Sequence, residues 1–144
     1  MKFILNWVWQ LPQHLLALLL IWVTGAEKMR ATEVIPINIW KYDPKNWFNR
    51  YISGVSLGMF IILPMRAVNM KTVLHEHGHS IQSRAWGPLY LLAVGIPSAV
   101  FNNLWDRLFH KNWPAEKRIK WYYSRYPEKQ ADKLGGVVRD FQGA

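Results

Sequence analysis

His75-Glu76-His77-Gly78-His79 contains the pattern H-E-x-x-H, in which the second histidine follows the first by four positions. Residues four apart lie on one face of an α-helix, about one turn from each other. His75 and His79 can therefore direct two imidazole rings at one metal ion, while Glu76 reaches a water molecule on that ion. The pattern predicts a zinc site with a general base beside it.

The residues on either side predict that this pattern lies in the middle of a helix. Asn69 is a good N-cap for a helix that covers residues 70–84. Gly87 and Pro88 should end this helix. Apolar residues recur at helical spacing along a second face, which gives the helix a side to bury. His77 lies off the face of the two predicted ligands, and we expect it to be a packing or rim residue rather than a ligand.

The other segments of the sequence predict strands and helices, and hence a fold of the α+β class. Residues 34–43 and 54–63 are predicted as strands, because both are rich in β-branched and aromatic residues and are bounded by Pro or Gly. A turn signal at 44–46 lies between them. A short helix should begin at Pro127, a good first helical position, and end at residues 135–136. We expect a small β-hairpin or sheet packed with the helix of the metal motif.

Composition limits the chemistry open to the chain. It has 144 residues, enough for one domain with a modest core, and no cysteine, which excludes disulfides, thiolate zinc sites and thiol nucleophiles. Hydrophobic residues make up 51%, and the nine tryptophans favour a bilayer surface, where one end of the ring is apolar and the other wet. The net charge is +9. We therefore expect anionic membrane lipid as a partner and no nucleic acid.

The first apolar segment, residues 1–25, is long enough to cross a bilayer. Its first half is amphipathic because of polar residues such as Asn6, Gln10 and His14. We expect a membrane-inserted or amphipathic anchor helix, which either spans the membrane or lies along it. A cleaved signal peptide and a buried helix of a water-soluble protein are the alternatives. Residues 26–144 are expected to form a single domain.

Two histidines hold zinc poorly without a third protein ligand. The candidates downstream of the motif are Asp106, His110, Glu116, Glu128, Asp132 and Asp140. Glu128 is the best of them, because the first turn of a helix favours a carboxylate. Asp132 follows one turn later on the same face, where it can accept a hydrogen bond from the outer N–H of a zinc-bound histidine.

The order of these residues resembles a known group of enzymes. The H-E-x-x-H pattern and the later run Glu-Lys-Gln-Ala-Asp at 128–132 are similar to the H-E-x-x-H and E-x-x-A-D signature of gluzincin metallopeptidases. The closest likeness is to integral-membrane members such as the heat-shock membrane protease and the CaaX prenyl protease. The resemblance implies that His75, His79 and Glu128 bind Zn²⁺. It also implies that Glu76 is the base, that Asp132 supports a ligand, and that a minimal zincin-like domain aligns its substrate along strand 54–63.

A second resemblance concerns the amino-terminal part of the chain. The run Trp-Gln-Leu-Pro-Gln at 9–13 and the run from Gln82 to Tyr90 are similar to segments of short bacterial and phage-associated proteins without a characterised function. This likeness implies a common fold and supplies no activity.

The predicted site makes a demand on the second apolar segment, residues 88–105. His75 and Glu128 flank this segment, yet each must lie within about 2 Å of one ion. A single crossing would separate them, so we expect a re-entrant or half-buried segment that either turns back at Gly95 and Pro97 or packs inside the protein. Both flanks are basic, as expected if both face the cytoplasm. We expect the bacterial cytoplasmic membrane, with the site on its cytoplasmic side or at the interface.

These features predict a membrane-associated zinc metallopeptidase that hydrolyses a peptide or protein with a zinc-bound water and Glu76 as the base. The anionic intermediate needs a further donor, and the candidates are Tyr90, Tyr122, Tyr123, Tyr126 and Arg125. The alternative is a non-catalytic membrane protein with a structural zinc site. A basic nucleic-acid-binding protein is a weaker third hypothesis.

Overall fold

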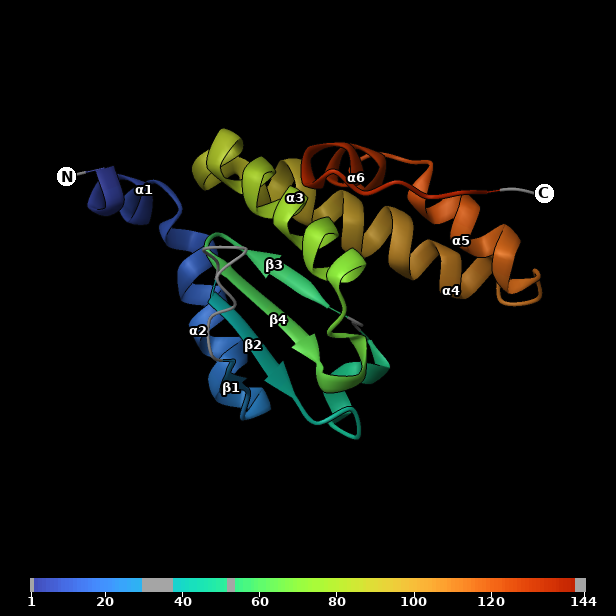
Figure 1. Ribbon diagram of the computed structural model, residues 1–144, viewed down its shortest axis with the longest axis horizontal. Helices are drawn as coiled ribbons and strands as arrows, with labels where there is room; N and C mark the ends of the chain where they lie inside the picture. The colour runs from blue at the N-terminus through green and yellow to red at the C-terminus, as the bar shows by residue number, and fades with distance from the viewer. Residues whose placement is uncertain (1, 30–37, 52–53, 142–144) are drawn as a thin grey trace.

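The computed structural model describes residues 2–29, 38–51 and 54–141, which form a mixed α+β fold (Figure 1). The strands are β1 (Glu27–Lys28), β2 (Asn38–Tyr42), β3 (Val55–Leu57) and β4 (Phe60–Pro64). They form one sheet in the order β1-β2-β4-β3, in which β2 and β4 are parallel and the two outer pairs are antiparallel. The predicted α+β class is confirmed.

Six α-helices accompany this sheet in the described residues. They are α1 (Lys2–Trp9), α2 (Leu11–Thr24), α3 (Met70–Trp86), α4 (Trp105–Phe109), α5 (Ala115–Tyr123) and α6 (Glu128–Gly135). Short 3-10 turns are η1 (Trp47–Arg50), η2 (Met65–Ala67) and η3 (Gly87–Leu89), and two wider π-helical segments are η4 (Leu91–Gly95) and η5 (Pro97–Leu104).

The segment predicted as a single strand, 54–63, is a β-hairpin instead. β3 and β4 pair in antiparallel register, and the chain reverses at Gly58, whose φ is +64°. Glycine adopts this left-handed conformation without the steric cost that other residues meet. The other predicted strand, 34–43, is observed as β2 over 38–42, and residues 34–37 lie outside the described residues.

β4 is buried along its whole length and separates two cores. Successive side chains of a strand point to opposite faces of the sheet. Ile62 therefore packs with Ala17 of α2 on one face, whereas Ile61 packs with Val73 of α3 on the other. α3 contacts this second core through Val73 and Leu74 near its amino end. Further along the helix the contact with the sheet is polar, because the Ser80 and Ser56 hydroxyls share a buried hydrogen bond (2.8 Å).

The amino-terminal segment consists of two helices, α1 and α2, at an angle of 81°. No single helix among the described residues has both the length and the apolarity to cross a membrane, and the bent pair α1–α2 has them only when its two parts are taken together. The single anchor helix expected over 1–25 is therefore broken near Gln10. α2 lies against the sheet, and His14 Nε2 accepts a hydrogen bond from the Met59 N–H (3.2 Å) at the hairpin turn.

Both ends of α3 follow the sequence signals. The Asn69 side chain accepts a hydrogen bond from the Thr72 N–H (3.0 Å), and Gly87 follows the helix with φ +52°. The ring of Trp9 lies where a Cβ at residue 87 would be, and its Nε1 donates to the Arg84 carbonyl oxygen (3.0 Å). The Trp-Gln-Leu-Pro-Gln run therefore docks on the carboxyl end of α3.

The second apolar segment is a nearly continuous helical rod from η3 to α4 (Figure 1). Of the two alternatives for this segment, the turn back at Gly95 and Pro97 is not observed. Pro97 lies where the two π-helical segments η4 and η5 follow each other, and the chain remains helical through it. The chain reverses only after Phe109, where α5 begins its return. The rod is half-buried, since residues such as Val94 and Asn102 face the protein.

Candidate metal centre

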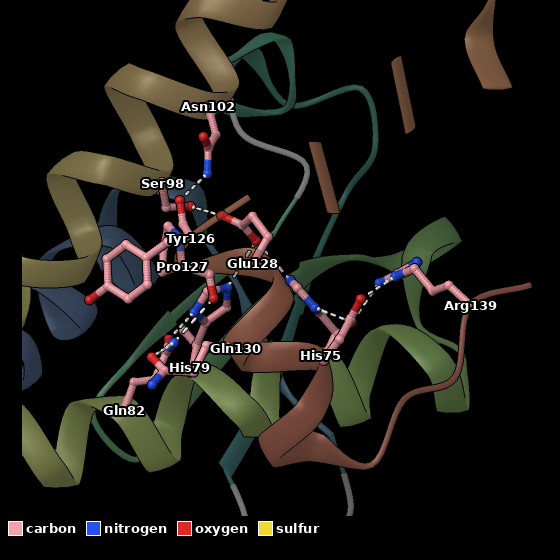
Figure 2. Close-up of polar contacts among 12 residues, drawn as sticks. His75, His79, Gln82, Ser98, Asn102, Tyr126, Pro127, Glu128, Gln130 and Arg139 are labelled. Atoms are coloured by element: carbon pink, nitrogen blue, oxygen red, sulfur yellow. Dashed lines mark hydrogen bonds and ion pairs between the residues drawn. The ribbon is translucent and has the colours of Figure 1, made fainter. Parts of the chain in front are cut away.

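Three side chains from two helices converge on one point (Figure 2). His75 and His79 project from α3, and Glu128 projects from the first turn of α6. Glu128 Oε2 lies 3.1 Å from His75 Nε2 and 3.2 Å from His79 Nε2. One ligand atom from each residue lies within 4.8 Å of the others, and all three residues are buried. The group can hold a metal ion.

The donor set suits zinc. Around a tetrahedral zinc ion with ligands about 2.1 Å away, neighbouring ligand atoms are about 3.4 Å apart. The separations of 3.1 and 3.2 Å between the carboxylate oxygen and the two ring nitrogens are close to that value. Two imidazoles and one carboxylate also form the protein part of many catalytic zinc sites, in which the fourth position stays open.

A close contact between α3 and α6 brings Glu128 to the histidines. A Cβ at Gly78 would lie 1.9 Å from the Ala131 carbonyl oxygen, and a Cβ at Gly135 would lie 1.9 Å from the Leu74 carbonyl oxygen. Only residues without a Cβ let the two backbones approach so closely. The glycine inside the metal motif therefore sets the distance between the two halves of the site.

The outer ring nitrogens of both histidines are held by hydrogen bonds. His75 Nδ1 donates to Asp132 Oδ1 (2.7 Å), and Asp132 is the residue predicted for this role. His79 Nδ1 donates to Gln82 Oε1 (2.7 Å), and Gln82 Nε2 donates to the Pro127 carbonyl oxygen (3.1 Å). Each bond directs the Nε2 atom of its ring toward the metal position. Gln82 follows His79 by three residues on α3, so both side chains lie on one face of the helix, but the metal motif does not include it.

Ser98 of η5 holds the second carboxylate oxygen of Glu128. Its hydroxyl donates to Glu128 Oε1 (2.5 Å), which leaves Oε2 for the two histidines. The Tyr122 hydroxyl is hydrogen-bonded to Ser98, and Asn102 Nδ2 donates to the Tyr126 carbonyl oxygen (2.9 Å). The helical rod therefore positions the third ligand. No sequence pattern indicated Ser98, because the contact joins segments thirty residues apart.

Arg139 contacts the site from the carboxyl-terminal segment. Its guanidinium donates to both Asp132 oxygens (2.5 and 2.9 Å) and lies 3.3 Å from the ring centre of Tyr123. The Tyr123 ring in turn packs edge-on against His75, with 5.2 Å between ring centres. These contacts fix Asp132 and, through it, the His75 ring. Sequence reasoning missed Arg139, which lies beyond the last predicted helix.

The buried group attracts positive charge. Burial opposes protonation of His75, but hydrogen bonds with Asp132 and Glu128 outweigh it and raise the pKa of His75 to about 9. Burial also opposes ionisation of Glu128, yet hydrogen bonds from the two histidines hold the pKa of its carboxyl well below its usual range. A metal ion that binds here takes the place of protons on the two rings.

Glu76 lies at the wall of a cleft that opens onto the metal group. The cleft has a volume of about 610 Å³, and residues 54–57 line it together with His75, Glu76, His79 and Glu128. Burial raises the pKa of the Glu76 carboxyl. A carboxyl with a raised pKa is suited to accept and return a proton near neutral pH.

The structure divides the five candidates for an oxyanion donor. Three of them line the cleft: Tyr90, Tyr122 and Tyr123. The Tyr90 hydroxyl donates to a backbone carbonyl oxygen of β3 (3.0 Å). Tyr126 donates its hydroxyl to the Ala93 carbonyl oxygen (2.8 Å), and Arg125 lies over the ring of Trp121 (4.8 Å). Neither Tyr126 nor Arg125 is part of the cleft lining.

The other acidic and histidine candidates lie outside the metal group. Asp106 instead accepts hydrogen bonds from Arg118 (2.6 Å) and from His110 Nδ1 (3.3 Å). In the ranges that the structure describes, His75, His79 and Glu128 are the one set of three such side chains close enough to share an ion.

Comparison of the chain with known protein families, curated proteins and solved structures finds no match. The likeness to gluzincin peptidases therefore stays a prediction from the motifs. A functional proposal for this chain rests on the geometry of the site.

Proposed function

We propose that this chain is a membrane-associated zinc metallopeptidase in which Glu76 is the general base. The observation that carries the proposal is the buried group of His75, His79 and Glu128 at the wall of an open cleft that Glu76 also lines. Structural zinc sites are usually closed by four protein ligands, whereas this group offers three and borders space for a substrate.

His75, His79 and Glu128 would hold zinc, which when bound supplies Lewis acidity for the scissile carbonyl and lowers the pKa of a water molecule in the open position. The Glu76 carboxylate would accept the proton of that water and pass it to the leaving amine. Asp132 would keep the His75 ring in place throughout.

The position of β3 supports a peptide as the substrate. This strand lies at the edge of the sheet, and residues 54–57 line the cleft. An edge strand offers backbone N–H and C=O groups with which an extended peptide can pair. A peptide bound in this way would pass the metal group.

Two helical segments support association with membrane lipid. The helical rod from η3 to α4 buries Asn102 and Asp106 while it exposes Leu92 and Phe101. α2 has the same inverted arrangement, since it buries His14 and other polar residues and exposes leucines. Polar side chains inside and apolar side chains outside suit a lipid environment better than water. We place the protein at the bacterial cytoplasmic membrane, with the site on its cytoplasmic side or at the interface.

Zinc analysis and a peptide library test the proposal. The purified protein should bind about one zinc ion per chain, and His79→Ala should lose it because a three-ligand site cannot spare a ligand. Glu76→Gln should keep the zinc and lose cleavage of the library, since an amide does not accept the proton. Zinc binding without cleavage by the wild type would support a non-catalytic membrane protein with a structural zinc site. A protein that binds no zinc would overturn both readings.

A further inference from the structure

The cleft beside the metal group carries an excess of positive charge. Four cationic side chains line it: Lys71, Arg107, Arg118 and Arg139. Two of these are paired with buried carboxylates, Arg118 with Asp106 (2.6 Å) and Arg139 with Asp132 (2.5 Å). These two pairs contribute little net charge to a ligand in the cleft.

Lys71 and Arg107 are not balanced in this way. In the described part of the chain, neither forms an ion pair with a carboxylate. Arg107 donates to two neutral oxygens, the Asn103 side chain (2.7 Å) and the Arg50 carbonyl. The carboxylates of Glu76 and Glu128 also line the cleft, and a bound divalent ion would balance their two charges. The charge of Lys71 and Arg107 therefore remains available to an anionic group.

Lys71 is the better placed of the two cations to meet a substrate. It precedes His75 by four residues on α3, as His75 precedes His79, so the three side chains share one face of the helix. Four residues, about 6 Å along the helix axis, separate Lys71 from the first ligand. An extended peptide advances about 3.4 Å per residue, so a side chain one or two residues from the scissile bond lies at that distance.

We propose that the cleft selects peptides with Asp or Glu one or two residues from the scissile bond, and that Lys71 recognises this carboxylate. The inference rests on the proposed peptidase function and names the substrate class of the same site. Opposite charges a few ångströms apart attract measurably at a partly exposed site, and added salt weakens the attraction.

Peptide pairs that differ only by Glu against Gln, or Asp against Asn, test the inference on the zinc-loaded protein. The wild type should cleave the acidic member with a kcat/KM about tenfold higher at low salt, and the ratio should fall as NaCl is added. Lys71→Glu should reverse the preference, so that a Lys peptide is cleaved faster than a Glu peptide. The substitution should be tolerated in the fold, because Lys71 is exposed and the first turn of a helix favours an acidic side chain.

Lys45→Glu is the matched control. It makes the same change in net charge on an exposed turn that does not line the cleft, so it should leave the preference for acidic peptides intact. The zinc content of every variant is measured alongside. Equal cleavage of Glu and Gln peptides by the wild type would overturn the inference, as would an unchanged preference in Lys71→Glu.

Binding measurements separate failure of this inference from failure of the peptidase proposal. Zinc-loaded Glu76→Gln is titrated with fluorescent Glu and Gln peptides, and the Glu peptide should bind more tightly. Adding Lys71→Glu should remove the advantage of the Glu peptide, so that the Gln peptide binds at least as tightly. A preference in binding without hydrolysis by the wild type would sink the peptidase proposal and keep the anion-selective cleft. Hydrolysis without any preference in rate or binding would support the peptidase proposal and overturn the anion-selective cleft.

Discussion

At the scale of single residues, Glu128 shows how the site is specified by contacts outside the motif. One carboxylate oxygen faces both histidine rings, and the other accepts the Ser98 hydroxyl. We expect Ser98→Ala to weaken zinc binding about tenfold or more, because loss of an outer hydrogen bond lets a ligand reorient. The Ser98→Thr variant should bind zinc like the wild type, since it keeps the hydroxyl. Competition with a chelator measures the affinity, and Ser124→Ala, which removes an exposed hydroxyl, should bind zinc like the wild type.

His14 gives the fold a pH dependence that is separate from the metal group. Its Nε2 accepts the Met59 N–H and its Nδ1 donates to the Trp7 carbonyl oxygen (3.1 Å), so the neutral ring is the form that fits. Burial lowers the pKa of His14 below its usual 6.5. A histidine with a depressed folded-state pKa stabilises the fold above the unfolded pKa and loses that contribution as the pH falls.

We therefore expect the stability that depends on His14 to decline below about pH 6.5, by up to about 1.4 kcal/mol per pH unit. The measurement is thermal unfolding of metal-free wild type and His14→Gln between pH 7.5 and 5.5. His14→Gln should be less stable at pH 7.5, and the gap between the two proteins should narrow toward pH 5.5. A gap that is constant with pH would show that His14 is not held neutral.

At the scale of elements, the contact between α3 and α6 decides whether the three ligands meet. Gly78→Ala would drive a methyl group into the Ala131 carbonyl, so α6 must move away and carry Glu128 with it. We expect a loss of about 1–3 kcal/mol in the free energy of unfolding and a drop in zinc affinity of at least tenfold. Gly95→Ala is the control, because its Cβ would meet nothing closer than 3.6 Å. Equal zinc affinity in both variants would contradict this role for Gly78.

The same elements show which features a sequence can predict. The amino end of α3 was predicted from Asn69 because capping is a local interaction between neighbours along the chain. The hairpin was missed because Gly58 lies inside an apolar run that also suits one long strand. Ser98 and Arg139 were missed for another reason. The Ser98 contact with Glu128 exists only after distant helices have packed. Arg139 lies seven residues after Asp132, but its contact depends on how the chain turns after α6, which no periodicity or motif encodes.

At the scale of the whole molecule, two helical segments, α2 and the rod, turn polar residues inward and apolar residues outward. The segments meet at Gly87, whose carbonyl oxygen accepts a hydrogen bond from Gln13. The outward side chains of the rod include Leu92 at 65% exposure and Phe101 at 56%, and Trp22 of α2 is 78% exposed. Exposing such an apolar surface to water is unfavourable in free energy, whereas contact with lipid hydrocarbon would remove that cost. At the proposed membrane, a net charge of +9 would add attraction to an anionic leaflet.

Flotation with lipid vesicles tests this arrangement directly. The wild type should float with vesicles that contain anionic lipid, and replacing both Leu92 and Phe101 by Gln should reduce the bound fraction strongly. Each apolar side chain contributes about 1.5–3 kcal/mol when it moves from water to an apolar phase, so two should change partitioning by about a hundredfold or more. Thermal unfolding should change little, because both side chains are exposed.

The control variant combines Leu134→Gln with Val138→Gln, which removes exposed apolar side chains from α6 and the carboxyl-terminal segment. This control should float like the wild type. An equal loss of vesicle binding in both double variants would mean that the exposed apolar face of the rod is not the surface that contacts lipid.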